Sequence, residues 1–229
     1  MIFLKSSLAS ALLVVALFSA TTAWAGDLTG PQENAVRSAK QYLRTEGFSR
    51  RGLIQQLSSS ASGYSVADAT VAVDSLHIDW AKEAVRSAKQ YLSTEGFSRR
   101  ELIQQLSSSA GSGYSVADAT VAVDSLHIDW AKEAVRSAKQ YLRTEGFSRR
   151  GLIQQLSSSA SGYSVADATV AVDSLHIDWD KEAVRSAKQY LSIEGFSCRG
   201  LIHQLSSSAG SGYTVNQATY GAQQSGACP

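Results

Sequence analysis

One stretch of sequence occurs four times in this 229-residue chain, with periods of 49, 50 and 49 residues. Residues 35–83 and 134–182 differ at a single position. A period of this length is typical of arrays in which one supersecondary unit is repeated and neighbouring units share a core. The motif AVRSAKQYL opens the copies at Ala35, Ala84, Ala134 and Ala183. The predicted units are residues 35–83, 84–133, 134–182 and 183–229, after a lead-in at residues 26–34.

Apolar residues recur at helical spacing throughout each unit, and no segment alternates as a strand would. The second unit shows three such segments, the first of which ends before Gly96. The expected buried faces are Trp80, Ala84, Ala88, Tyr91 and Leu92 in the first segment, Leu102, Ile103 and Leu106 in the second, and Val116, Ala119, Val123 and Leu126 in the third. The sequence therefore predicts an all-α fold, with three helices in a helix-turn-helix-like arrangement per unit.

Two capping signals mark the starts of the second and third helices. Ser98 is followed three residues later by Glu101, and Ser115 is followed in the same way by Asp118. Both spacings predict a capping box, in which the two residues satisfy each other's backbone N–H groups. The serine–glycine tract between these helices predicts a surface loop, since two of the four copies carry one extra glycine there.

The sequence DSLHIDW occurs three times, each time where the third helix of one unit meets the first helix of the next. We expect its last aspartate to cap the new helix and its tryptophan to pack between units. Pro31 stands at the tryptophan position of the first unit, and GACP replaces the joint after the last. We favour a break between His77 and Asp79 over one long kinked helix. The tryptophans expected between units are Trp80, Trp130 and Trp179.

The same joint contains serine, histidine and aspartate, which could suggest catalysis or metal binding. Residues this close on a helix end point in different directions, so a nucleophile, base and acid would not converge. One histidine per unit also lies a full repeat from the next and has no ligand partner nearby. We therefore expect no catalytic residue, no metal site, no cofactor and no enzymatic activity. The histidines concerned are His77, His127 and His176.

Both cysteines lie in the last unit, where Cys198 replaces an arginine of the other copies and Cys228 replaces the joint aspartate. In an oxidising compartment this coincidence predicts a disulfide that fastens the C-terminal tail to the second helix. Two free thiols are the alternative.

Basic residues form the repeated surface signal of the units. We predict a contact surface for an acidic protein partner, and the alternative is a solvated face paired with Glu46, Asp68 and Asp74. The chain has a formal net charge of +1, and residues 1–25 hold one charge, Lys5, so the remainder is neutral. This balance argues against nucleic-acid binding. The candidate partner-binding residues are Arg37, Lys40, Arg44, Arg50, Arg51, Arg86, Lys89, Arg136, Lys139 and Arg143.

Residues 1–25 have the pattern of a secretory signal peptide. Lys5 precedes an apolar run too short for a membrane span, and the sequence AWA ends at Ala25. No later segment is apolar enough to cross a bilayer. We therefore expect an exported protein, periplasmic or at the cell surface, with cleavage after Ala25.

The repeated elements YLRTEGFSRRGLIQQL, YSVADATVAVDSLHIDW and AKEAVRSAKQYL resemble the helical repeat of Ltp-like host cell surface-exposed lipoproteins. The resemblance covers residues 31 to 226. It implies tandem helix-turn-helix units outside the cell and, for phage-encoded members, superinfection exclusion by binding a tail or injection protein. A lipoprotein needs a cysteine after the cleavage site, whereas Gly26 follows Ala25, so we expect no lipid anchor. The resemblance favours a non-enzymatic envelope protein that binds another protein, and the alternative is a structural or adhesive envelope protein.

Overall fold

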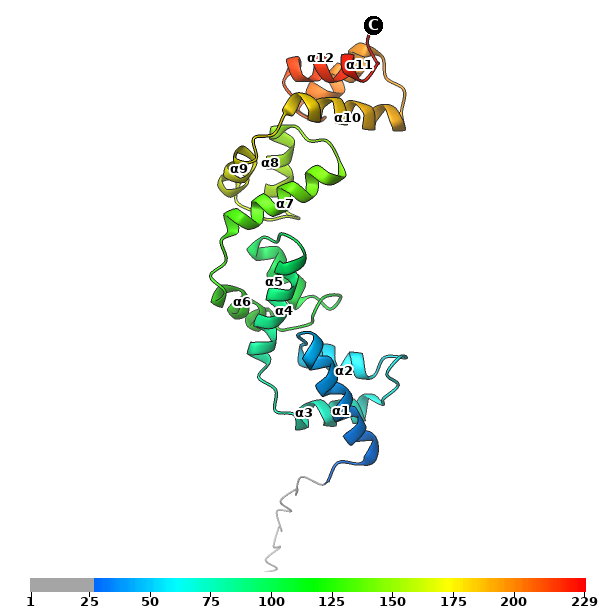
Figure 1. Ribbon diagram of the computed structural model, residues 1–229, viewed down its shortest axis with the longest axis vertical. Coiled ribbons are helices and arrows are strands. Elements are labelled where there is room, and N and C mark those ends of the chain that lie inside the picture. Colours follow the sequence, from blue (N-terminus) through cyan, green and yellow to red (C-terminus); the bar gives the residue numbers. More distant parts are fainter. Residues whose placement is uncertain (1–26) are drawn as a thin grey trace, which may run out of the picture.

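The computed structural model describes residues 27–229, and the predicted signal peptide lies outside this range. Within it the chain forms twelve helices and no strand. The helices group in threes, and the four groups follow one another in single file along an elongated molecule (Figure 1). The predicted all-α array of four three-helix units is therefore confirmed.

Helix bounds follow the repeat. The first helix of units 2, 3 and 4 begins at tryptophan, four residues before the motif AVRSAKQYL. Each unit is therefore taken from the start of its first helix, so that Trp80, Trp130 and Trp179 belong to units 2, 3 and 4. The helices are α1 (Gly30–Thr45), α2 (Arg50–Leu57) and α3 (Val66–Ser75) in unit 1; α4 (Trp80–Thr94), α5 (Arg99–Ser107) and α6 (Val116–Ser125) in unit 2; α7 (Trp130–Thr144), α8 (Arg149–Ser157) and α9 (Val165–Ser174) in unit 3; and α10 (Trp179–Ile193), α11 (Cys198–Ser206) and α12 (Val215–Gln224) in unit 4.

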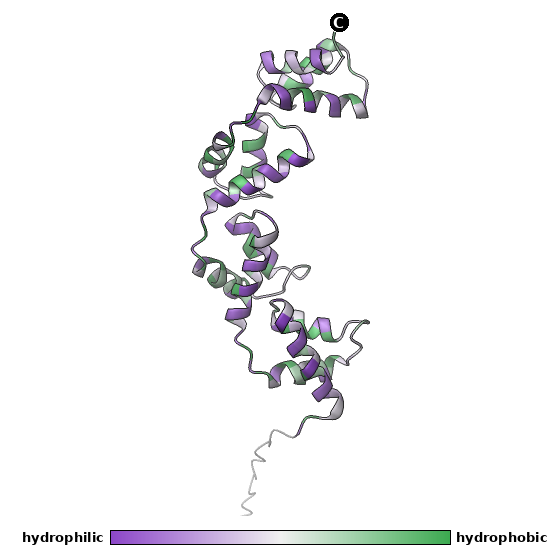
Figure 2. Ribbon diagram, in the orientation of Figure 1, coloured by the Kyte–Doolittle hydropathy of each residue, from purple (hydrophilic) through white to green (hydrophobic). Residues whose placement is uncertain are grey.

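Each unit has its own small core, and the most closely packed helix pairs all lie within one unit. Two leucines of the second helix are fully buried between small residues of the first and third helices, which let the backbones approach closely. Hydrophobic and hydrophilic residues are interleaved along the helices (Figure 2), as amphipathic helices require. The fully buried residues of unit 2 are Ala84, Ala88, Leu102, Leu106, Ala119 and Val123.

Val116 was expected in this core, and that prediction is wrong because 65% of the residue is exposed. The buried face of α6 is centred on Ala119, Ala122 and Val123. At about 100° per residue, Val116 lies roughly 70° to one side of that face, on the first turn. Helical spacing alone therefore placed Val116 in the core, although it lies at the edge of the buried face.

The two predicted capping boxes have different outcomes. Ser98 and Glu101 form the full box: the Glu101 N–H donates to Ser98 Oγ at 3.1 Å, and the Ser98 N–H donates to Glu101 Oε2 at 2.9 Å. Ser115 Oγ accepts from the Asp118 N–H at 3.0 Å, but the Asp118 carboxylate accepts from the Ser115 hydroxyl instead of its N–H. Aspartate is one methylene shorter than glutamate, so its carboxylate stops at the hydroxyl.

Candidate functional site

The joint between units is a sharp break, and the alternative of a fused helix is excluded. α3 ends at Ser75 and α4 begins at Trp80. Between them His77 has a φ of 49°, in the left-handed region, and its Nδ1 lies 2.9 Å from the carbonyl oxygen of Ser75. Asp79 then caps α4, because its Oδ1 accepts from the Lys82 N–H at 3.1 Å. The histidine is thus part of a turn, and within residues 27–229 no group of three or more His, Cys, Asp or Glu side chains could hold a metal ion.

The tryptophans connect successive units. Trp80 is the first residue of α4 in unit 2, yet it packs against the core of unit 1. Trp130 and Trp179 pack in the same way against the cores of units 2 and 3. In unit 4 the residues packed at the end of the core are Ala227 and Cys228. Each tryptophan therefore completes the core of the unit before its own.

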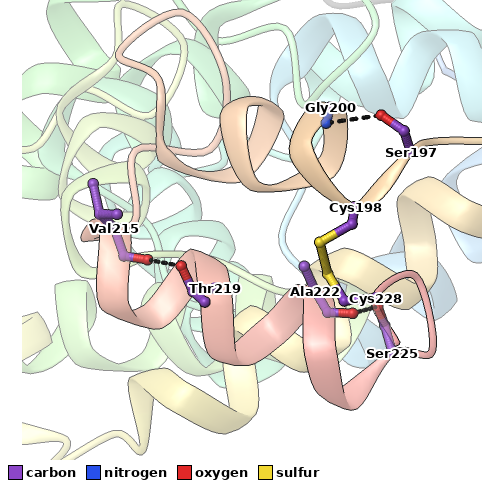
Figure 3. The surroundings of a disulfide bond; sticks show 8 residues. All are labelled: Ser197, Cys198, Gly200, Val215, Thr219, Ala222, Ser225 and Cys228. Atoms are coloured by element: carbon purple, nitrogen blue, oxygen red, sulfur yellow. Dashed lines mark hydrogen bonds between the residues drawn. A yellow bond between two sulfur atoms is a disulfide. The ribbon is translucent and has the colours of Figure 1, made fainter.

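A disulfide closes the last unit. Cys198, at the start of α11, is bonded to Cys228 in the tail beyond α12, with 4.7 Å between the two Cα atoms (Figure 3). In unit 1 the equivalent of Cys198 is Arg50, whose Nε lies 2.6 Å from Oδ1 of Asp74 and lowers the pKa of that carboxyl through its hydrogen bonds. Units 2 and 3 repeat this ion pair. At the first position of the second helix, the last unit therefore has a disulfide, whereas the other three units have an arginine in a salt bridge.

A second set of arginines joins neighbouring units. Arg86 of α4 donates from Nη2 to the carbonyl of Arg44 at 2.9 Å and from Nη1 to the carbonyl of Leu43. These carbonyls end α1, where they have no partner within the helix and where the helix dipole is negative. Arg86 therefore supplies the C-terminal cap of the preceding unit's first helix. Equivalent bonds run from Arg136 to the carbonyl of Leu92 and from Arg185 to the carbonyls of Leu142 and Arg143.

Glycine allows the first helix of one unit to touch the loop of the unit before it. A Cβ on Gly47 would lie 2.5 Å from Ser87 Oγ and 2.8 Å from the Ser87 backbone nitrogen. The Gly47 N–H donates to Oε1 of Gln90 at 2.8 Å. Gly96 and Gly146 make the same close approach to Ser137 and Ser186. No other residue would fit without moving the backbone.

Valine in place of Gly146 should lower the free energy of unfolding by about 1–3 kcal/mol, the usual range for overpacking. The new Cβ would lie 2.5 Å from Ser186 Oγ and 2.7 Å from the Ser186 nitrogen, so units 3 and 4 must separate. Urea unfolding followed by circular dichroism measures the loss. Gly195→Val is the matched control, because nothing lies within 4 Å of that Cβ position in unit 4. Equal losses in the two variants would contradict the predicted contact.

The junctions alternate between two forms. At junctions 1–2 and 3–4, the third residue of the second helix is glycine and the facing loop is the longer one. Ser49 Oγ donates to the carbonyl of Ser112 at 2.5 Å, and a Cβ on Gly52 would lie 3.2 Å from that carbonyl. At junction 2–3 the equivalent residue is Glu101 and the facing loop is the shorter one, with Ser161 buried in it. Burial raises the pKa of Glu101. The long loop fills the space that the glutamate side chain occupies at the other junction.

Polar recesses lie along these junctions. The recess between units 2 and 3 has a volume of about 400 Å³, and Glu95, Glu101, Gln140 and Tyr141 are among its lining residues. The recess at junction 1–2 has about 340 Å³ and is lined in part by Gln56 and Tyr91. Both are open grooves, and their walls combine hydroxyl, amide and carboxylate groups with aromatic side chains.

The predicted basic surface divides into engaged and exposed residues. Arg50 pairs with Asp74, and Arg86 and Arg136 cap helices of the preceding unit. The side chain of Arg51 lies beside Gly113 of the next unit. The remaining predicted residues are exposed and are Arg37, Lys40, Arg44, Lys89, Lys139 and Arg143.

The lysine position of this surface is occupied and exposed in all four units. Lys40, Lys89 and Lys139 are exposed, and within residues 27–229 their side chains form no ion pair or hydrogen bond. Lys188 holds the same position in unit 4 and is also exposed. It was missed from the sequence, although the repeat alignment alone identifies it. The array thus presents one exposed lysine per unit at one structural position.

Comparison with known proteins identifies the repeat. No curated protein and no solved structure matches the chain. No helix of residues 27–229 has both the length and the apolar composition needed to cross a membrane. The sequence model of the family described as host cell surface-exposed lipoprotein matches residues 31–76, 79–126, 129–175 and 178–224, one match for each three-helix unit. The chain therefore belongs to the family of host cell surface-exposed lipoproteins.

Proposed function

We propose that the protein is a non-enzymatic, exported binding protein that holds a protein partner at the cell surface through several weak contacts. The observation that carries this proposal is the exposed lysine repeated once in each unit. Arginines at several other basic positions form ion pairs or hydrogen bonds within the fold. The side chains of these lysines form none within the described residues 27–229. Repeated weak contacts on one array add up to tight binding without any single strong site.

The surface supports a partner with an acidic face. An ammonium group at one position of each unit repeats a positive charge once per unit along the array. Exposed ion pairs of this kind contribute only about 0–1 kcal/mol each, so several units must act together. The family resemblance gives the partner class that we propose, a tail or injection protein of an incoming phage, bound so that superinfection is excluded. The alternative is a structural or adhesive envelope protein without a specific ligand.

Charge reversal on three units tests the proposal. The triple variant Lys89→Glu, Lys139→Glu, Lys188→Glu should bind the partner at least about 10-fold more weakly. Three lost contacts of up to about 1 kcal/mol each, together with the repulsion between the new carboxylates and the acidic face, exceed the 1.4 kcal/mol of a tenfold change. The matched control is Lys82→Glu, Lys132→Glu, Lys181→Glu. It changes the net charge equally on the same three helices, at residues that pair with the capping aspartates instead.

The measurement is capture from phage lysate and from envelope extract on the immobilised wild type and both variants, with bound proteins identified by mass spectrometry. A phage tail or injection protein retained by the wild type and the control, but lost from the Lys89 triple, would support the proposal. Equal retention by both triple variants would exclude the lysines as the contact. Retention of host envelope proteins alone would move the protein to the structural alternative.

A further inference from the structure

The two ends of the array carry the two unpaired halves of the internal junction. At each internal junction the first helix of the later unit presents an arginine, a serine and a glutamine to the earlier unit. Unit 1 has the same three residues, and no other unit of residues 27–229 covers them: Arg37 and Gln41 are exposed, whereas the equivalent Arg86 and Gln90 are half-buried in the junction. Arg37 instead donates to Asn34 of its own helix.

The other end of the array shows the complementary half. Gly195 of unit 4 is exposed and a Cβ there would meet nothing within 4 Å, whereas the equivalent glycines of units 1 to 3 lie against the next helix. Ser197 is exposed, although the other three N-cap serines of the second helices are at most 3% exposed. Within residues 27–229 no arginine donates to the last carbonyls of α10, unlike those of α1, α4 and α7. The residues buried at internal junctions are thus exposed at this end.

We propose that the Gly195 end of one molecule docks on the Arg37 end of a second copy of this chain, in the arrangement that the internal junctions already show. Arg37 would then cap α10 of the other molecule, as Arg86 caps α1, and Gln41 would accept from the N–H of Gly195. The occupant is a second copy because three junctions within the chain demonstrate the fit of these residues to each other.

The contact between molecules is weaker than the internal junctions, for two structural reasons. No tryptophan bridges it, since unit 1 has Pro31 at that position. The tail residues Ala227 and Cys228 also occupy the place of the joint on the unit 4 core, so residues 27–31 of the second copy must lie beside that tail. The contact between molecules also places Gly200 against the short loop of unit 1. This pairing causes no steric clash, but the space that the extra glycine of a long loop fills at junctions 1–2 and 3–4 stays empty. Because the interface joins different faces, it continues from molecule to molecule and gives open filaments of increasing length.

This association does not depend on the partner proposed above, because the lysines stay exposed at the internal junctions and take no part in them. Sedimentation equilibrium of the protein without its first 25 residues tests it, between about 10 µM and 1 mM, the range of weak complexes. We expect the average mass to rise above the monomer with concentration. Monomeric mass throughout the range would overturn the proposal.

Two variants that each block one end distinguish docking from misfolding. Gly195→Val fills the space that the incoming helix needs, and Arg37→Glu with Gln41→Glu places carboxylates against the carbonyls of the other molecule. Each variant alone should stay monomeric with an unchanged melting temperature. Their equimolar mixture should form a heterodimer and nothing larger, because one open end of each kind remains. Association of either variant alone, or no heterodimer in the mixture, would overturn the proposal.

Discussion

Alanine in place of Trp130 should lower the free energy of unfolding by about 2–4 kcal/mol, somewhat less than the 3–5 kcal/mol typical of a fully buried tryptophan. Trp130 is half-buried, and it packs against the core of unit 2 although it belongs to the first helix of unit 3. Its loss opens that core to water and also removes an apolar contact between units 2 and 3. Unfolding should therefore become less cooperative as well as easier.

Urea unfolding followed by circular dichroism gives both quantities. The midpoint should fall, and the transition should broaden because unit 2 and unit 3 no longer unfold together. Val121→Ala is the control, since Val121 lies in α6 of unit 2, the unit whose core Trp130 completes, and is 65% exposed. We expect it to change the stability by less than about 0.5 kcal/mol. A Trp130→Ala variant as stable as this control would show that the units fold independently of the tryptophan.

Loss of the disulfide should lower the free energy of unfolding of the last unit by about 3–4 kcal/mol. Cys198 and Cys228 are 30 residues apart, and closing a loop of this length removes that much chain entropy from the unfolded state. The effect is concentrated in unit 4, where Ala227 and Cys228 pack on the core in place of a tryptophan. Serine at both positions, compared with the wild type in chemical unfolding, measures it.

Reductant provides the internal control for this prediction. It should destabilise the wild type to the level of the double serine variant and leave that variant unchanged. A further variant, Cys198→Arg with Gln223→Asp and Cys228→Ser, would rebuild the ion pair of the other units and should recover at most about 1 kcal/mol. A wild type insensitive to reductant would show that the bond does not constrain the unfolded chain.

The fold could be predicted from the sequence to a large extent because the repeat removes most of the ambiguity. Helical spacing within one unit gives three helices, and three further copies repeat the same evidence. The break at the joint was predicted from capping by Asp79, but the left-handed conformation of His77 was not. The last unit pointed to this conformation, since Gly226 stands at the position of His77 and has a φ of 85°. Glycine adopts the left-handed region without steric cost.

The candidate contact surface was harder to predict from the sequence than the fold. Arg86 and Lys89 are one turn apart on α4, and spacing places both on an outward face. Which of them meets the neighbouring unit depends on the rotation between units, and the pattern within one unit does not contain that rotation. Arg86 consequently caps the preceding helix while Lys89 stays exposed.

The alternating junctions restrict how the gene for such an array can change length. Removal of unit 3 alone would place Glu101 against the long loop of unit 4, where the space for its side chain is filled by backbone. Recombination between units 1 and 3, which are nearly identical, instead removes two units and leaves a junction of the permitted kind. Loss of unit 3 alone should therefore be disfavoured in this array, whereas loss of two units by this recombination is tolerated.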